Sequence, residues 1–179
     1  AAVLEYGMNH AGEIRALTGI ARPRIATVTK VGYAHVENFE DGIEGVARAK
    51  RELVEALPPD GTAVLNYDDE SVRGFSASHT GGTVFYGLNP GADVRAEDVE
   101  HVETGTRFRV GATRFETRLH GEHAVRNILA GISVASLFGL KPGQLAEAVA
   151  ALVLGKMRGE RFVHRGIVVI NDCYNSNPE

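Results

Sequence analysis

Residues 25–68 read IATVTKVGYAHVENFEDGIEGVARAKRELVEALPPDGTAVLNYD, and this stretch decides the fold. It opens with a short apolar run, continues through a segment with helical periodicity, and closes with a second apolar run. Both runs are continuous rather than alternating, which is typical of strands covered on both faces of a sheet. Parallel strands need a crossover, usually a helix, to join them. The stretch therefore predicts an α/β fold with a mostly parallel sheet and flanking helices.

The rest of the chain repeats this alternation, with one interruption. Residues 1–7, AAVLEYG, predict a buried strand, and a helix is expected from about residue 12 to 20. Between about residues 83 and 119 the pattern changes to alternating runs with glycine-containing turns, which predicts a small antiparallel insert. After the insert, the sequence predicts a helix in AVRNILAGISVASLFG, a second helix in PGQLAEAVAALV and a closing strand from about Ile167 to Ile170.

Composition excludes several classes of protein. The chain has 179 residues, 44% of them hydrophobic and 23% charged, with a formal net charge of -4. These values are typical of an ordinary globular domain and lack the clustered basic face of a nucleic-acid-binding protein. No apolar run is long enough to span a membrane. The single cysteine, Cys173, cannot form an internal disulfide and is compatible with the cytoplasm, where we expect the protein to act.

The ends of the chain suggest an excised piece of a larger fold. The sequence opens directly in a strand-like run without an initiating methionine, and it stops in a turn just after another strand-like run. We therefore expect these 179 residues to be a central domain that is normally flanked by others.

One lysine lies on the apolar face of its helix. Lys50 falls within the stripe formed, at helical spacing, by Ile43, Val46, Ala47, Leu53, Val54 and Leu57. The charged residues off this stripe have the spacing of two surface ion pairs, Arg48 with Glu52 and Arg51 with Glu55. Lys50 has two interpretations: its ammonium reaches solvent at the helix edge, or it reaches a polar site at one end of the sheet.

Polar residues follow the predicted strands. They are Glu5 with the loop GMNHAGE, Lys30 with VGYAHVENF, Asn66 with the acidic residues Asp68 and Asp69, and Asn171 with Asp172 and YNSNP. Ligands of open parallel sheets bind beyond the carboxyl ends of the strands. Each residue also has a simpler interpretation as a turn former or helix cap.

Three of these polar residues suit a divalent cation. The carboxylate of Glu5 and the imidazole of His35 are potential ligands, and oxygen ligands favour Mg²⁺ over zinc. A lysine ammonium would repel the cation. Lys50 could join the site only as a carbamate, formed when its neutral amine reacts with carbon dioxide.

Five motifs occur in one order along the chain. They are E-x-G-M-N-H-x-G-E-I at 5–14, V-G-x-A-H-x-E-x-F at 31–39, A-R-A-K-x-E-L at 47–53, V-L-N-x-D-D at 64–69 and D-x-Y-N-x-N-P at 172–178. This ordered set resembles the central, ATP-binding domain of the Mur ligases over residues 1–179. The resemblance implies a fold of the P-loop type. It also implies ATP-driven amide-bond formation, in which a peptide carboxylate is phosphorylated and an amine then displaces the phosphate.

The resemblance also implies roles for the metal-site residues. Glu5 matches a ligand of the Mg²⁺ that accompanies the ATP phosphates, and His35 matches a ligand of a second Mg²⁺. Lys50 matches the lysine that the family carbamylates to support that second ion. Metal ions of this kind stabilise the charge that develops on a transferring phosphoryl group. Lys50 and His35 are therefore the expected catalytic residues.

A second group of residues is implied on the nucleotide side: Asn127 near adenine, Arg158 near the nucleotide, Asp172 near the ribose or phosphates, and the segment containing Tyr174, Asn175 and Asn177. The chain departs from the family pattern at three positions. Ala124 stands where an asparagine is usual, Lys30 where asparagine is frequent, and Tyr33 where proline is common. These departures affect the expected adenine and metal contacts.

The phosphate-binding G-x-x-G-K-T loop of the family occurs nowhere in the sequence. We therefore expect the isolated chain to be inactive. EYGMNHAGEI and DCYNSNP favour the branch of the family that adds D-alanyl-D-alanine to UDP-N-acetylmuramoyl-tripeptide. The alternatives are another Mur ligase, a ligase resembling folylpolyglutamate synthase, a non-catalytic binding module with the same fold, and a two-metal hydrolase with a bridging carbamylated lysine.

Overall fold

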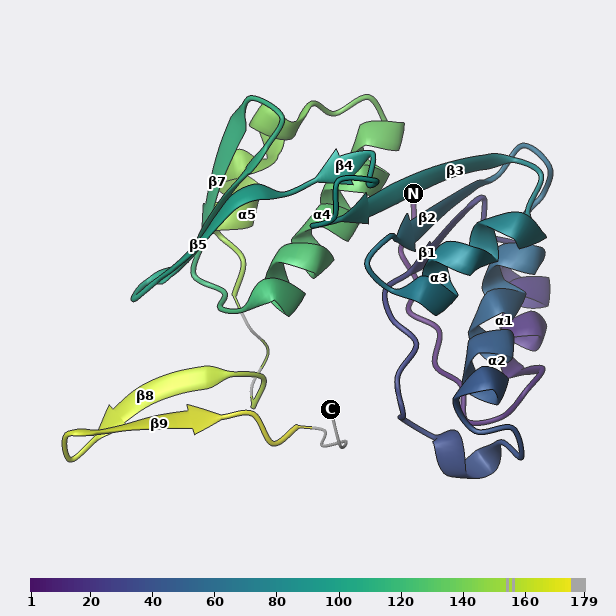
Figure 1. Cartoon of the computed structure of the whole chain (residues 1–179), viewed down its shortest axis with the longest axis horizontal. Helices are drawn as coiled ribbons and strands as arrows, with labels where there is room; N and C mark the ends of the chain where they lie inside the picture. Colours follow the sequence, from purple (N-terminus) through teal and green to yellow (C-terminus); the bar gives the residue numbers. More distant parts are fainter. Residues whose placement is uncertain (154, 156, 175–179) are drawn as a thin grey trace.

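The fold is organised around a four-stranded parallel sheet (Figure 1). The computed structural model describes residues 1–153, 155 and 157–174. The sheet has the order β1-β2-β3-β4, with β1 Ile25–Val28, β2 Thr62–Asn66, β3 Gly82–Gly87 and β4 Val94–Arg95. All neighbouring strands in this sheet run parallel. The predicted α/β class with a mostly parallel sheet is confirmed.

Helices cover both faces of the sheet (Figure 1). One side carries α1 Glu13–Ala21, η1 Val36–Asn38, α2 Ile43–Glu55, α3 Glu70–Gly74 and η2 Phe75–Ser78. The other side carries α4 Glu122–Leu137, and the η3 Pro142–Leu145 and α5 Ala146–Ala150 that follow it pack against the antiparallel strand at residues 113–117. The predicted α1, α2 and α4 are confirmed, and the second C-terminal helix begins as a 3₁₀ turn. Gly139, with φ +81°, ends α4 as expected of a glycine after a helix.

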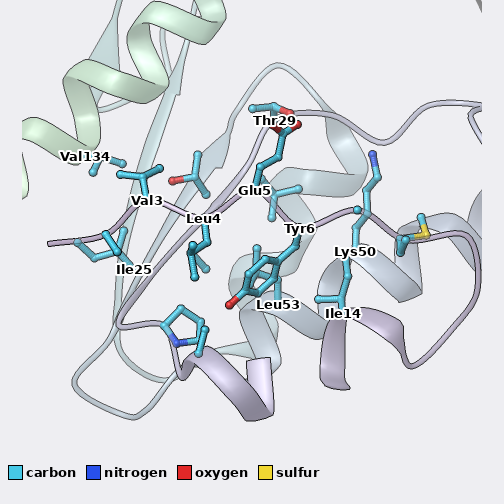
Figure 2. A pocket seen from close by; sticks show the side chains of 18 of the residues that line it. Val3, Leu4, Glu5, Tyr6, Ile14, Ile25, Thr29, Lys50, Leu53 and Val134 are labelled. Carbon is cyan, nitrogen blue, oxygen red and sulfur yellow. The ribbon is translucent and has the colours of Figure 1, made fainter. Parts of the chain in front are cut away.

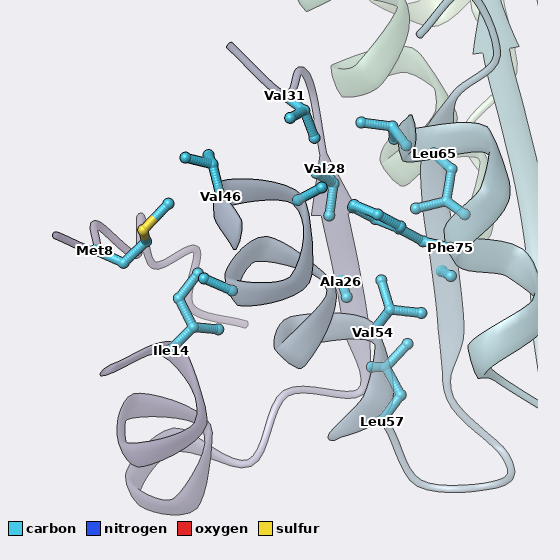
Figure 3. Packing of buried hydrophobic residues seen from close by; sticks show 14 residues of the cluster. Met8, Ile14, Ala26, Val28, Val31, Val46, Val54, Leu57, Leu65 and Phe75 are labelled. Atoms are coloured by element: carbon cyan, nitrogen blue, oxygen red, sulfur yellow. The ribbon is translucent and has the colours of Figure 1, made fainter. Parts of the chain in front are cut away.

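Two apolar cores result, and β2 contributes to both. Ala63 and Leu65 belong to the core beneath α1 and α2, where Phe75 packs beside Val28 and Leu65 (Figure 3). Val64 belongs to the other core, with α4 and the antiparallel strands. This division follows from the alternation of side chains along a strand.

The antiparallel insert is smaller than the sequence suggests. It comprises β5 Glu97–Val102, β6 Gly105–Val110 and β7 Thr113–Thr117, paired in that order. The prediction that residues 83–119 form it is wrong at its start, because TVFYG lies in β3 and pairs parallel with β2. Strand propensity does not tell whether a strand pairs parallel or antiparallel. In the structure this run belongs to the main sheet, where the Tyr86 side chain is fully buried.

Both predicted terminal strands lie outside the main sheet. Residues 1–7 form no strand, and a cavity lies between them and β1, so no hydrogen-bonded ladder forms. β9 Ile167–Asn171 pairs antiparallel with β8 Glu160–His164 in a separate two-stranded hairpin (Figure 1). The prediction of a buried strand at residues 1–7 is therefore wrong, because this segment is mostly exposed and pairs with no strand. The closing strand is confirmed, but its partner is β8 rather than the main sheet.

One of the two predicted ion pairs on α2 is also wrong. Arg51 Nε binds Glu55 Oε1 at 2.8 Å as expected, but Arg48 pairs with Asp41. Glu52 is buried, 7% exposed, and its two carboxylate oxygens accept backbone N–H groups at the start of α1. The N-cap residue of α1, Gly12, has no side chain to do this, so α2 supplies the cap from outside.

Candidate functional site

A cavity of about 940 Å³ lies between the N-terminal segment, β1 and α2. Its lining includes Glu5, His35 and Lys50, three residues that come from different parts of the chain. Figure 2 shows the Glu5 side chain pointing toward Thr29, with the Lys50 side chain extending alongside the N-terminal segment. Glu5, His35 and Lys50, the three residues expected to hold metal ions, therefore line one cavity.

The lining of this cavity is mixed. Apolar side chains, among them Val3, Leu4 and Leu53, lie between and beside Glu5 and Lys50 (Figure 2). Val3 is 95% exposed and Leu4 is 61% exposed. The cavity thus combines charged and apolar side chains, and it is open to solvent beside the N-terminal segment.

Lys50 is half-buried, and its amine is directed to the end of β1. Lys50 Nζ donates a hydrogen bond of 2.6 Å to the backbone carbonyl of Lys30. This hydrogen bond is exposed to solvent, so the structure agrees with both interpretations of the sequence position of Lys50: its ammonium is solvent-accessible, and it lies at the sheet end.

His35 adopts a left-handed backbone conformation, with φ 65° and ψ 13°, at the start of η1. Non-glycine residues adopt this conformation infrequently. The imidazole is exposed, and the His35 carbonyl accepts a hydrogen bond from the Asn38 amide at 3.0 Å. The turn thereby places the histidine side chain on the lining of the cavity.

The donor set fits a magnesium ion that is shared with a phosphate ligand. Among the described residues no cluster of three or more His, Cys, Asp or Glu side chains is positioned to hold a metal on its own. Mg²⁺ characteristically takes only one or two protein ligands and completes its coordination with water and phosphate oxygens. One carboxylate and one imidazole on the lining of the same cavity meet that requirement in number and type, whereas a structural zinc site would need four protein ligands.

The residues expected on the nucleotide side are divided between two places. Asn127 is exposed on α4, and the side chain of Ala124 on the same helix is buried. Arg158 lies against Tyr174, with its Cζ 4.3 Å from the ring centroid, at the base of the β8–β9 hairpin. Asp172 is exposed beside them, and Asn175 and Asn177 lie outside the described residues. None of the described members of this group lines the cavity.

In the acidic turn after β2, the Asp68 side chain joins three parts of the fold, namely the end of β2, the residues after β3 and α4, and we call it a junction for that reason. The Asp68 side chain, 7% exposed, accepts hydrogen bonds from the amides of Leu88 and Asn89, from Asn89 Nδ2, and from Arg126 Nε at 2.9 Å. Burial alone would raise the pKa of Asp68, but these hydrogen bonds outweigh it and hold the pKa below its usual value. The same Arg126 binds Glu122 at 3.0 Å, so the junction extends to the first turn of α4.

Asp69, the second acidic residue of this turn, bonds in two directions. Its Oδ1 accepts the amide of Val72 and caps α3, while its Oδ2 accepts the amide of Val31 at 2.9 Å. The alternative interpretation of these residues as turn formers is therefore correct. Glu52, Tyr86 and Arg126 were missed because their partners lie 37 to 58 residues away, a separation that local spacing rules do not reach.

Comparison with known proteins gives a consistent result. The model of the Mur ligase middle domain matches residues 1–135. The UDP-N-acetylmuramoyl-tripeptide–D-alanyl-D-alanine ligase of Bacillus subtilis is 32% identical over 180 residues, which cover 99% of this chain and 38% of the relative. The Mycobacterium tuberculosis ligase of the same name is 35% identical over 184 residues, covering 99% of this chain and 36% of that protein. The chain thus spans less than two-fifths of the length of these relatives.

Solved structures agree with the sequence matches. A crystal structure of MurF from Acinetobacter baumannii has a TM-score of 0.90 at 27% identity, covering 98% of this chain and 39% of that one. MurF ligase from Thermotoga maritima, solved in complex with ADP, has a TM-score of 0.80 at 26% identity, covering 95% of this chain and 40% of that one. The sequence and the fold together show that this chain belongs to the Mur ligase family and contains its middle domain.

Proposed function

We propose that this chain is the ATP-binding middle domain of a ligase that adds D-alanyl-D-alanine to UDP-N-acetylmuramoyl-tripeptide in peptidoglycan precursor synthesis, in the cytoplasm. ATP would convert the tripeptide carboxylate to an acyl phosphate, and the amine of D-alanyl-D-alanine would displace the phosphate. The similarity to ligases of that name and to a MurF structure with ADP supports this proposal.

The observation that carries the proposal is the common cavity of Glu5, His35 and Lys50. Bound Mg²⁺ would neutralise phosphate charge and stabilise the charge that develops during phosphoryl transfer. Glu5 and His35 would hold the metal directly. Lys50 would contribute as a carbamate, whose two oxygens replace the repulsive ammonium by an anionic ligand.

The proposed nucleotide contacts come from the second group of residues. Asn127 would contact adenine, and Arg158, Asp172, Tyr174 and Asn175 would contact the ribose or phosphates. Arg158 and Tyr174 are already stacked on each other, an arrangement that orients the guanidinium. Because the phosphate-binding G-x-x-G-K-T loop is absent from this sequence and the described members of this group do not line the cavity, we expect the isolated chain to release no phosphate from ATP. Magnesium-dependent phosphate release that copurifies with the 179-residue chain would contradict that expectation.

Substitutions at Lys50 test the metal role directly. Lys50→Glu supplies a carboxylate without carbon dioxide, whereas Lys50→Arg keeps a positive charge that cannot form a carbamate. In the longer ligase that contains this domain, we expect Lys50→Arg to abolish ligation and Lys50→Glu to retain Mg²⁺ binding. Equal Mg²⁺ affinity of the two variants, measured by calorimetry, would argue against a ligand role for Lys50.

Acceptor specificity tests the substrate. The longer protein is expected to ligate D-alanyl-D-alanine and to reject single amino acids such as glutamate or lysine. Preference for a single amino acid would assign the chain to another branch of the family.

A further inference from the structure

Four consecutive residues at the carboxyl end of β1 are each held by a side chain from a different place in the fold. The carbonyls of Val28, Thr29 and Lys30 accept hydrogen bonds, and the amide of Val31 donates one. Their partners are, in order, Tyr86 Oη at 3.2 Å, Asn66 Nδ2 at 2.7 Å, Lys50 Nζ at 2.6 Å and Asp69 Oδ2 at 2.9 Å. We call these four side chains the β1 clamp.

The clamp begins where the sheet ends. The ladder between β1 and β2 stops at the pair Val28 and Leu65, so Thr29 and the residues after it have no strand partner on that side. Asn66, the next residue of β2, takes over with its side-chain amide, which donates to the Thr29 carbonyl. Thr29 is exposed, so its carbonyl could bond to water instead, and the Asn66 amide is what ties this carbonyl to the end of β2.

Asn66 is itself firmly fixed. It is 5% exposed, and its Oδ1 accepts the amide of Asp68 at 3.0 Å, which leaves Nδ2 aimed at Thr29. Neither Asn66 nor Asp69 lines the cavity, whereas Thr29, Lys30 and Lys50 do. Asn66 therefore acts on the cavity only through the backbone that it holds.

We infer that Asn66 is a positioning residue for the amine of Lys50. By fixing Thr29 it fixes the adjacent Lys30 carbonyl, which holds Lys50 Nζ at the carboxyl end of β1, in the cavity that Glu5 and His35 also line. This inference rests on the proposed function for its importance, since a lysine that carries a metal ligand must present its terminal nitrogen in one place. A carbamate retains one N–H, so the same carbonyl remains a suitable acceptor after the modification.

The experiment measures the position of the amine without metal or nucleotide. The 179-residue chain is treated with a limiting amount of acetic anhydride, and acetylation of Lys50 is measured by peptide mass spectrometry relative to the exposed Lys141. Asn66→Ser removes the donor to Thr29, and Asn66→Asp places a carboxylate against that carbonyl. In both variants we expect the ratio of Lys50 to Lys141 acetylation to rise about fivefold, the factor that corresponds to one ordinary hydrogen bond.

Two controls separate positioning from general loosening. Tyr86→Phe removes the donor to Val28, which stays in the ladder with β2, so the ratio should not change. Ile132→Val lowers stability from the buried face of α4, away from the clamp, and should also leave the ratio unchanged. An unchanged ratio in Asn66→Ser, or an equal rise in Ile132→Val, would overturn the inference and leave Asn66 a merely structural residue.

Calorimetry with MgCl₂ keeps the two proposals apart. If the wild-type chain binds Mg²⁺, Asn66→Ser should bind it several-fold more weakly, and unchanged affinity would count against the inference. If the wild-type chain binds no Mg²⁺, the proposed metal role fails in this chain, and the acetylation ratio alone decides whether Asn66 positions Lys50.

Discussion

Replacing Asp68 with asparagine should destabilise the domain strongly, although the two side chains have the same shape. One carboxylate oxygen accepts the Leu88 amide and Arg126 Nε, and the other accepts both nitrogens of Asn89. A carboxamide has only one acceptor oxygen, so in either orientation its NH₂ group faces two donors.

The size of the effect follows from these contacts. Two donors lose their acceptor at about 1–3 kcal/mol each, so the free energy of unfolding should fall by about 2–6 kcal/mol. For a chain of this length, at about 2–4 °C per kcal/mol, that loss corresponds to a melting temperature lowered by about 4–24 °C. Urea unfolding followed by far-ultraviolet circular dichroism measures it.

A matched control variant tests whether the loss of stability is specific to Asp68. Asp93→Asn alters an exposed carboxylate that accepts a single amide, that of Phe85, at 2.8 Å. We expect a loss below about 1 kcal/mol there, because water can replace the bond. If Asp68→Asn costs no more than Asp93→Asn, the assignment of Asp68 as a junction is wrong.

The same carboxylate should shape the response to acid. The pKa of Asp68 is lower in the folded state than its ordinary value, so the folded state favours the deprotonated form. Its contribution is fully present above the unfolded pKa of about 4 and is lost as the pH falls through the lower folded value. Stability measured from pH 6 to pH 2 should therefore fall less steeply below about pH 4 in Asp68→Asn than in the wild type, and parallel curves would contradict this reasoning.

Three further substitutions and one control test the packing and the caps. Glu52→Ala removes the acceptor of two amides at the start of α1 and should cost about 2–4 kcal/mol, with faster hydrogen exchange confined first to α1; uniform acceleration would contradict the capping role. Gly105→Ala should cost more than about 2 kcal/mol by urea unfolding, because its φ is +146° and an added Cβ would lie 1.9 Å from the Thr117 carbonyl oxygen. The control, Gly111→Ala, would place a Cβ with nothing within 4 Å and should cost only about 1 kcal/mol in the same assay. Leu129→Ala empties a fully buried position and should cost about 2–5 kcal/mol by urea unfolding.

The sequence was most informative about single helices and strands, because the spacing of apolar residues within one element indicates its type and its buried face. The periodicity of residues 43–57 predicted α2 and the unusual position of Lys50, and alternation predicted the strands of the antiparallel insert. These patterns are local, because each helix or strand shows its buried face through its own spacing.

The sequence was least informative about partners. Residues 1–7 and 167–170 are as apolar as β1, yet neither segment joins the main sheet. Glu52 has the spacing of a surface ion pair, but it faces the start of a helix 37 to 40 residues earlier. Strand-end position and the family motifs singled out Glu5, His35 and Lys50 as the proposed metal ligands, and only the structure showed that they line one cavity.

Because side chains of β2 pack into both cores, this strand also determines how the two faces of the sheet are aligned with each other. Sliding this strand by one residue would exchange Val64 with Leu65 and mismatch both faces of the sheet at once, so its register is set from two sides. The helix that carries Lys50 lies over one face, and the helix that carries Asn127 lies over the other. One short strand thus serves as a common reference for the two halves of the domain, and a change in its register would misalign the cavity with the surface proposed for adenine.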